Sequence, residues 1–147
     1  MKKLLLLFCT AACLAACQTA DKKTTRPLTE EERMKAGNDT ANFTTIQWLD
    51  STSQDLGGIK EGQVVEISYR FKNSGTKSLV IESVNAQCGC TVAEKPEQPF
   101  APGEEGVIKA KFDSKDKVGA VSKYLTVTAN TNPDKEHRLI FNVQVSN

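Results

Sequence analysis

The sequence is poor in the residues that most often carry catalysis or stack on ligands. It has one histidine and one tryptophan, and aromatic residues make up 6% of the chain. The histidine, His137, has no orienting motif around it, so no Ser-His-Asp arrangement of a hydrolase is indicated. No glycine-rich phosphate loop is present either. We therefore expect a protein that is not an enzyme.

Neither sign of charge dominates the chain. Lysine and arginine together number 19, aspartate and glutamate number 18, and the formal net charge is +1. A nearly neutral chain has no basic field for nucleic acid, so no nucleic-acid partner is expected. The N-terminal apolar run opens at residues 4–8 and is too short to span a bilayer.

The first seventeen residues have the order of an export signal. Lys2 and Lys3 give a positive start, an apolar stretch follows, and residues 14–17 read Leu-Ala-Ala-Cys. This tetrapeptide resembles the bacterial lipobox, in which the cysteine takes a diacylglyceryl group and the chain is cut before it. The resemblance implies a signal peptide over residues 1–16 and lipidation of Cys17. The alternative is an ordinary secretory signal that is cut nearby.

A lipidated Cys17 would hold the protein on a membrane. Each buried CH₂ of an acyl chain contributes about 0.8 kcal/mol, and several chains such as palmitate give stable anchoring. Gln18 follows the cysteine, where an aspartate would favour the inner membrane, so the resemblance favours the outer membrane. We predict a lipid-anchored protein of the cell envelope.

Residues 17–42 are polar and are expected to form the lipidated N-terminus and a flexible tether. Within this segment Thr29 and Glu32 have the spacing of a capping box, which predicts a short helix over about residues 29–36 that ends before Gly37. A tether without any helix is the alternative.

Residues 43–147 show the alternation of apolar and polar residues that is typical of β-strands. The clearest case is the eight residues from Val65 to Lys72, while Gly57-Gly58 and Glu61-Gly62 are expected to break the chain. No helical pattern separates the strands, which argues against a parallel sheet. The pattern predicts an all-β fold, an antiparallel β-sandwich of about seven strands. The expected strands cover residues 44–50, 65–72, 79–84, 91–93, 108–113, 125–129 and 139–145.

Five short segments of this region resemble one bacterial family, the domain of unknown function numbered 1573. They are residues 71–75 (Phe-Lys-Asn-Ser-Gly), 79–81 (Leu-Val-Ile), 88–91 (Cys-Gly-Cys-Thr), 102–106 (Pro-Gly-Glu-Glu-Gly) and 112–113 (Phe-Asp). The resemblance covers about residues 44–145. It implies an immunoglobulin-like sandwich related to major-sperm-protein and hydin-type domains. It also implies lipoprotein or secreted relatives in Bacteroidetes, and it brings no established activity.

Cys88 and Cys90 are the only thiols left once Cys17 is lipidated and the signal peptide is removed. Alternate residues of a flat strand lie about 6.5–7 Å apart between Cα atoms. A disulfide usually needs about 4.4–6.8 Å, so a flat strand is marginal. Gly89 between the cysteines permits a kink that would bring the sulfurs together.

Three interpretations of this pair stay open. A disulfide in so small a ring would be easily reduced, which would suit redox exchange in an oxidising compartment. Two free thiolates could bind Cu(I), but a closed zinc site needs four ligands, and only His137 and Met34 remain as further soft or borderline ligands. The pair could also be structural, with or without a disulfide, as two small apolar groups at a tight bend.

Two hypotheses of function follow from these observations. The first is a non-enzymatic binding or scaffold module with a monomeric soluble domain and no cofactor. It would contact an envelope protein through its sheet edges, which we expect to be residues 44–50 and 139–145. The second is a thiol redox or Cu(I)-handling protein that uses Cys88 and Cys90.

Overall fold

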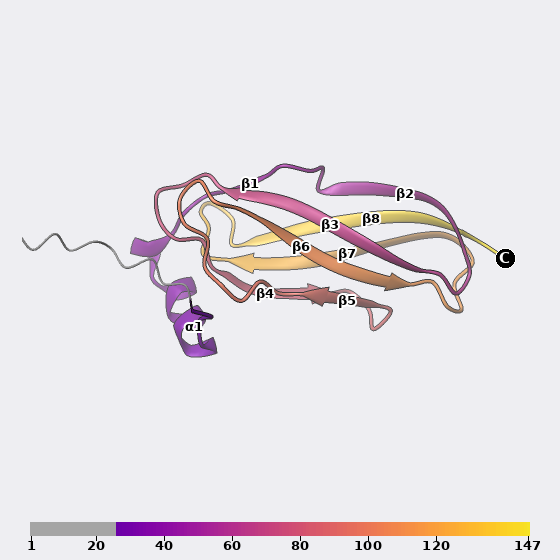
Figure 1. Cartoon of the computed structure of the whole chain (residues 1–147), viewed down its shortest axis with the longest axis horizontal. Helices are drawn as coiled ribbons and strands as arrows, with labels where there is room; N and C mark the ends of the chain where they lie inside the picture. The colour runs from indigo at the N-terminus through magenta and orange to yellow at the C-terminus, as the bar shows by residue number, and fades with distance from the viewer. Residues whose placement is uncertain (1–25) are drawn as a thin grey trace, which may run out of the picture.

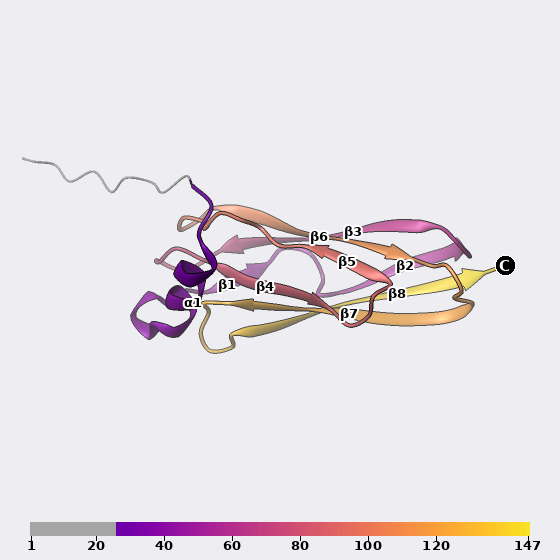
Figure 2. The same ribbon diagram turned by 90° about the horizontal axis from the view of Figure 1, so that it is seen from below.

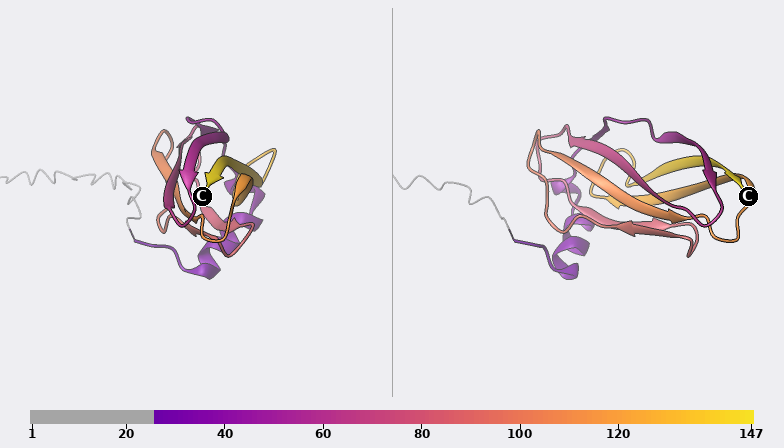
Figure 3. Two further views of the ribbon diagram at one scale, coloured as in Figure 1. Left: turned by 90° about the vertical axis from the view of Figure 1, so that its right-hand side faces the viewer. Right: turned by 45° about the vertical axis from the view of Figure 1, so that its right-hand side comes forward.

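Two four-stranded sheets pack face to face in the computed structural model, which describes residues 26–147 (Figures 1 and 3). The predicted all-β sandwich is confirmed, with eight strands in place of about seven. Neighbouring strands are antiparallel except for one parallel pair, β2 and β8. The first sheet has the order β1 (Ile46–Trp48), β3 (Val64–Asn73), β6 (Glu105–Asp113) and β5 (Thr91–Glu94). The second has the order β2 (Ser53–Lys60), β8 (Glu136–Ser146), β7 (Gly119–Ala129) and β4 (Ile81–Ala86).

The apolar residues of alternating strands face inward and form one core between the sheets. On β3, Ile67, Tyr69 and Phe71 are buried while the residues between them, Ser68 and Arg70, are exposed. Phe112 of the first sheet and Phe141 of the second meet across the core, with ring centroids 5.4 Å apart. Burying a large apolar side chain stabilises the fold by about 1.5–3 kcal/mol, so this layer is the main source of stability.

Strand β2 was not predicted, and the chain break expected at Gly57-Gly58 is wrong. β2 runs through both glycines, and the register shifts between Asp55 and Gly58, where Gly57 has a φ of 73°. The bulge removes the alternation that would have marked the strand in the sequence. The parallel partner, β8, lies far along the chain, so no local signal indicates this pairing.

Of the two predicted sheet edges, one is confirmed and the other is wrong. β1 is an edge of the first sheet, as expected. The last strand is not an edge, because β8 lies between β7 and β2, which pairs with it from Ile140 to Ser146. The remaining edges are β2, β4 and β5.

The predicted short helix is confirmed as α1 (Glu30–Asn38), two residues longer than expected at its C-terminal end. Thr29 and Glu32 form the complete capping box. The segment expected as a tether, residues 17–42, contains α1 and the 3₁₀ helix η1 (Thr40–Asn42) within its described part. Within residues 26–147, α1 is too short and too polar to cross a membrane, and no other helix does so.

A buried arginine holds α1 on the sandwich. The side chain of Arg33 is 1% exposed, and its guanidinium donates hydrogen bonds to the carbonyl oxygens of Ile81 (2.8 Å), Pro96 (3.3 Å) and Glu97 (2.5 Å). It also bonds the Glu97 carboxylate at 2.9 Å. Ile81 belongs to the second sheet, while Pro96 and Glu97 follow β5 of the first. Arg33 therefore bridges the two sheets.

The rest of the α1 interface is also polar. Lys95 pairs with Glu30 at 2.6 Å, and Lys135 donates to the carbonyl oxygen of Gly37 at 2.6 Å. Met34, the large apolar residue of the helix, is 65% exposed. The attachment of α1 thus depends on hydrogen bonds and ion pairs, and Arg33 and Gly37 are its buried residues.

We expect Arg33→Ala to release α1 while the sandwich stays folded. The substitution leaves buried carbonyl oxygens without donors, which costs about 1–3 kcal/mol. Cleavage by trypsin after Lys35 should become at least several-fold faster, while far-UV circular dichroism of the strands is unchanged. Met34→Ala, a change on the exposed face of the same helix, is the matched control. Equal cleavage rates for the two variants would contradict the proposal that Arg33 attaches α1 to the sandwich.

Candidate functional site

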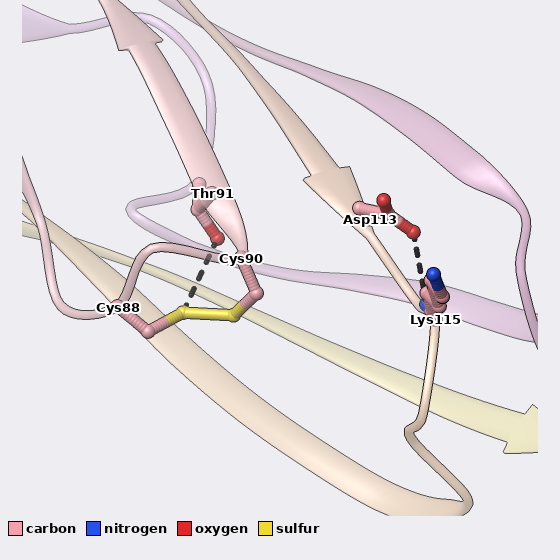
Figure 4. Close-up of a disulfide and its surroundings, with 5 residues drawn as sticks. All are labelled: Cys88, Cys90, Thr91, Asp113 and Lys115. Carbon is pink, nitrogen blue, oxygen red and sulfur yellow. Dashed lines mark hydrogen bonds between the residues drawn. A yellow bond between two sulfur atoms is a disulfide. The ribbon is translucent and has the colours of Figure 1, made fainter.

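The Cys-Gly-Cys motif forms the corner at which the chain passes from one sheet to the other. It follows β4, the edge of the second sheet, and precedes β5, the edge of the first (Figure 4). Cys88 and Cys90 are joined by a disulfide, with their Cα atoms 5.3 Å apart. This separation is shorter than that of alternate residues in a flat strand, because Gly89 lies in a turn that bends the backbone.

Backbone hydrogen bonds tie this corner to both sheets. The N–H of Gln87 donates to the carbonyl oxygen of Tyr124 on β7 at 3.1 Å. The N–H of Asp113 on β6 donates to the carbonyl oxygen of Cys90 at 2.9 Å. The N–H of Thr91 closes the turn on the carbonyl oxygen of Cys88 at 3.2 Å. Cys90 is half-buried and packs against the core. The disulfide therefore lies at the border between core and surface, in a turn that hydrogen bonds attach to both sheets.

The structure does not bring Met34 or His137, the remaining soft or borderline residues, to the two cysteines. Met34 lies on α1, at the opposite end of β4 from the disulfide corner, and His137 lies at the start of β8 (Figure 1). Among residues 26–147 no group of three or more histidine, cysteine, aspartate or glutamate side chains could hold a metal ion. Sulfurs that are bonded to each other do not act as thiolate ligands, so Cu(I) binding would require the reduced pair.

His137 is half-buried in a packing contact. Its Nε2 lies 2.9 Å from the hydroxyl of Thr131, and its ring meets the edge of Trp48 at 5.9 Å between centroids. Burial lowers the pKa of His137 below 6.5, and the nearby charge of Asp134 opposes this shift. Among residues 26–147 the side chain that is hydrogen-bonded to the ring is the Thr131 hydroxyl, and no carboxylate orients it.

A polar hollow of about 350 Å³ lies on the outer face of the first sheet. Its lining includes Glu66, Glu94, Lys109 and Lys111, and Lys111 pairs with Glu66 at 3.3 Å. Opposite charges alternate across it, and no aromatic ring lines it. Each of its two carboxylates lies opposite a lysine of β6, Glu66 opposite Lys111 and Glu94 opposite Lys109.

One sequence family matches most of the sandwich. Its profile, described as "Protein of unknown function (DUF1573)", covers residues 46–145. The chain belongs to the DUF1573 family. No curated protein matches the chain significantly.

Solved structures with the same fold come from bacteria and from human. The chain is similar in fold to a protein of unknown function from Porphyromonas gingivalis W83, with a TM-score of 0.62 and 15% identity over 72% of this chain and 49% of that one. The chain thus spans about half the length of that protein. The ASH / PapD-like domain of human CEP192 has a TM-score of 0.56 and 11% identity, over 71% of this chain and 87% of that one.

A third likeness is to the secreted serine protease VesC from Vibrio cholerae, with a TM-score of 0.51 and 11% identity. It covers 73% of this chain but only 24% of that one. At such identities the likeness concerns the fold alone. The PapD-like neighbour confirms the predicted immunoglobulin-like class.

The disulfide predicts a defined alkylation pattern and a modest stability effect. In the oxidised protein neither Cys88 nor Cys90 should react with iodoacetamide until a reductant is added, as read by intact mass. The variant with Cys88→Ser and Cys90→Ser should fold and lose about 1–2 kcal/mol of unfolding free energy, because so short a loop removes little entropy from the unfolded chain. Two thiols alkylated without reduction would contradict the disulfide.

The burial of His137 predicts a loss of stability in mild acid. Its folded pKa lies below the ordinary 6.5, so the unfolded chain takes up the proton first as the pH falls. This contribution is complete above about pH 6.5 and declines below it until the folded histidine is also protonated. Urea unfolding between about pH 7 and pH 5 should show a smaller decline for His137→Gln than for the wild type. An NMR titration of the single histidine that gives a pKa above 6.5 would refute this account.

Proposed function

We propose that this DUF1573 protein is a non-enzymatic binding module, held by a lipid on the envelope of a bacterium, with a protein as its partner. The observation that supports the proposal is that the side chains considered as candidate sites have their partners within the fold. Arg33 binds carbonyl oxygens, the two cysteines bind each other, and His137 packs on Trp48. Strand edges, which are suited to recognising other chains, remain open.

The anchor is the second part of the proposal. Cys17 lies outside the described residues, so the support comes from the sequence Leu-Ala-Ala-Cys before the polar segment. α1 follows that segment and docks at one end of the sandwich, with the disulfide corner toward the other end (Figure 1). The α1 end would face the membrane, and an outer-membrane site is the version that we propose.

The thiol alternative has less support. The disulfide is half-buried at a corner that both sheets hold, and Cys90 packs against the core. These contacts favour the structural interpretation of the pair. Redox exchange and Cu(I) binding stay predictions, which titration of the reduced protein with Cu(I) would test.

Lipidation at Cys17 is tested by labelling. Cells that express the full chain are fed labelled palmitate, and Cys17→Ser should abolish the label and move the protein out of the membrane fraction. Cys13→Ser, a change within the predicted signal peptide, is the matched control and should keep both properties. Label that persists in Cys17→Ser would overturn the anchor.

The binding role is tested by cross-linking in intact cells. The wild-type chain should be recovered with one or a few envelope proteins in reproducible amounts, as identified by mass spectrometry. Recovery of the chain alone, under conditions in which known envelope complexes are captured, would overturn the binding role.

A further inference from the structure

Two sheet edges lie along one open side of the sandwich. β4 is one edge of the second sheet and β5 is one edge of the first. Both strands lie toward the viewer in Figure 2. The disulfide corner joins them at one end. At the other end, Arg33 of α1 bridges Ile81 to the segment after β5. Between these two ends, β4 has β7 as its one neighbouring strand among the described residues, and β5 has β6.

The backbone of β4 presents unpaired groups on this side. In an antiparallel pair, residues alternate between those bonded to the neighbouring strand and those that point away from it. Gln87 is bonded to Tyr124 of β7, which places Asn85 and Ser83 in the bonded set. Val84 and Ala86 therefore point their N–H and C=O groups away from β7. Within residues 26–147, β7 is the only strand that is hydrogen-bonded to β4.

The facing edge of β5 is shorter and follows the same rule. The bond from Asp113 to the Cys90 carbonyl oxygen puts Val92 and Glu94 in the set that is bonded to β6. The N–H and C=O groups of Ala93 consequently point into the open side. β5 has only four residues, so it offers fewer such groups than β4.

Small apolar side chains lie on the core side of these two edges. Val84, Ala86, Cys90 and Ala93 are all partly buried and pack against the core. These four side chains, here called the apolar strip, form the border of the core on this side of the sandwich. Such a strip suits small apolar side chains that alternate along an extended chain.

The other two edges are less suited to a partner strand. β1 has three residues. β2 carries the bulge at Gly57, and the side chain of its Gln54 turns to the carbonyl oxygen of Ser68 at 2.9 Å. A bulge twists an edge away from further pairing.

We infer that the open side accepts an extended polypeptide segment of an envelope partner, which pairs with β4 as a fifth strand of the second sheet. The segment alternates small apolar residues, which face the strip, with polar residues, which face solvent. This inference rests on the proposed function and assigns it a surface. The disulfide corner and Arg33 then have a common role, since they fix the two ends of the β4 edge with which the segment pairs.

The hydrogen-bonding part is tested with a peptide probe and the full-length chain in detergent. The probe is a fluorescein-labelled peptide in which threonine alternates with valine or alanine between terminal lysines, and binding is read by fluorescence anisotropy. Two versions carry N-methyl groups on one or the other alternate set of amides. A strand faces each neighbour with one set, so one version should bind at least tenfold more weakly and the other should bind as the parent peptide does. Equal affinity of the two versions would overturn the inference.

The place of binding is tested by photo-cross-linking. Benzoylphenylalanine replaces Asn85, which is exposed on β4, or the control Gln47, which is exposed on β1. Cross-links to the peptide are expected from position 85 only. Cross-links from position 47 only would overturn the assignment to β4. They would show that the peptide binds at the β1 edge. Failure of the peptide to bind would overturn the inference, while cross-linking in cells tests the binding role separately.

A backbone variant completes the test. Val84→Pro removes an N–H that points away from β7, so the ladder with β7 is kept while the donor to a partner is lost. Ile46→Pro removes an equivalent outward N–H from β1. We expect at least tenfold weaker peptide binding for Val84→Pro and no change for Ile46→Pro, with circular dichroism as the check on folding. Equal effects of the two variants would count against β4, and the cross-linking result stands if Val84→Pro unfolds.

Discussion

Burial of the two inner sheet faces against each other is the constraint on which the rest of the structure depends. Neither sheet can cover its own apolar face, so both must be completed by the other. The chain therefore crosses between them five times, and the crossings from β1 to β2 and from β4 to β5 each join two edge strands. A crossing places polar backbone at the border of the core, and that backbone needs partners. On the β4–β5 side the partners are β7, β6 and the guanidinium of Arg33.

The local patterns of the sequence predicted the strands whose apolar residues face one core. On β3, alternation from Val65 to Lys72 corresponds closely to the buried and exposed residues. The capping box at Thr29 and Glu32 likewise predicted α1, since both partners lie within one turn. The features that the sequence did not predict depend on pairing between residues far apart in the chain. β2 has no clean alternation around its bulge, and its pairing with β8 decides that the last strand is internal.

The candidate site was located by the sequence, but its state and its surroundings were not. Cys88 and Cys90 were marginal for a disulfide in a flat strand, and the corner shortens their separation to 5.3 Å. Arg33 could not be distinguished from the other charged residues near it, because its burial depends on carbonyl oxygens far along the chain. The open side between β4 and β5 follows from the sheet order, which no local pattern contains.

The most direct measurement for the central claim is amide hydrogen exchange at single-residue resolution on the free protein. If β4 is an open edge, Val84 and Ala86 should exchange fast, while Asn85 and Gln87, which are bonded to β7, should be protected. An alternating pattern along β4 is the result that the account predicts. Uniform protection of all four amides would contradict it, because the edge would then already be covered.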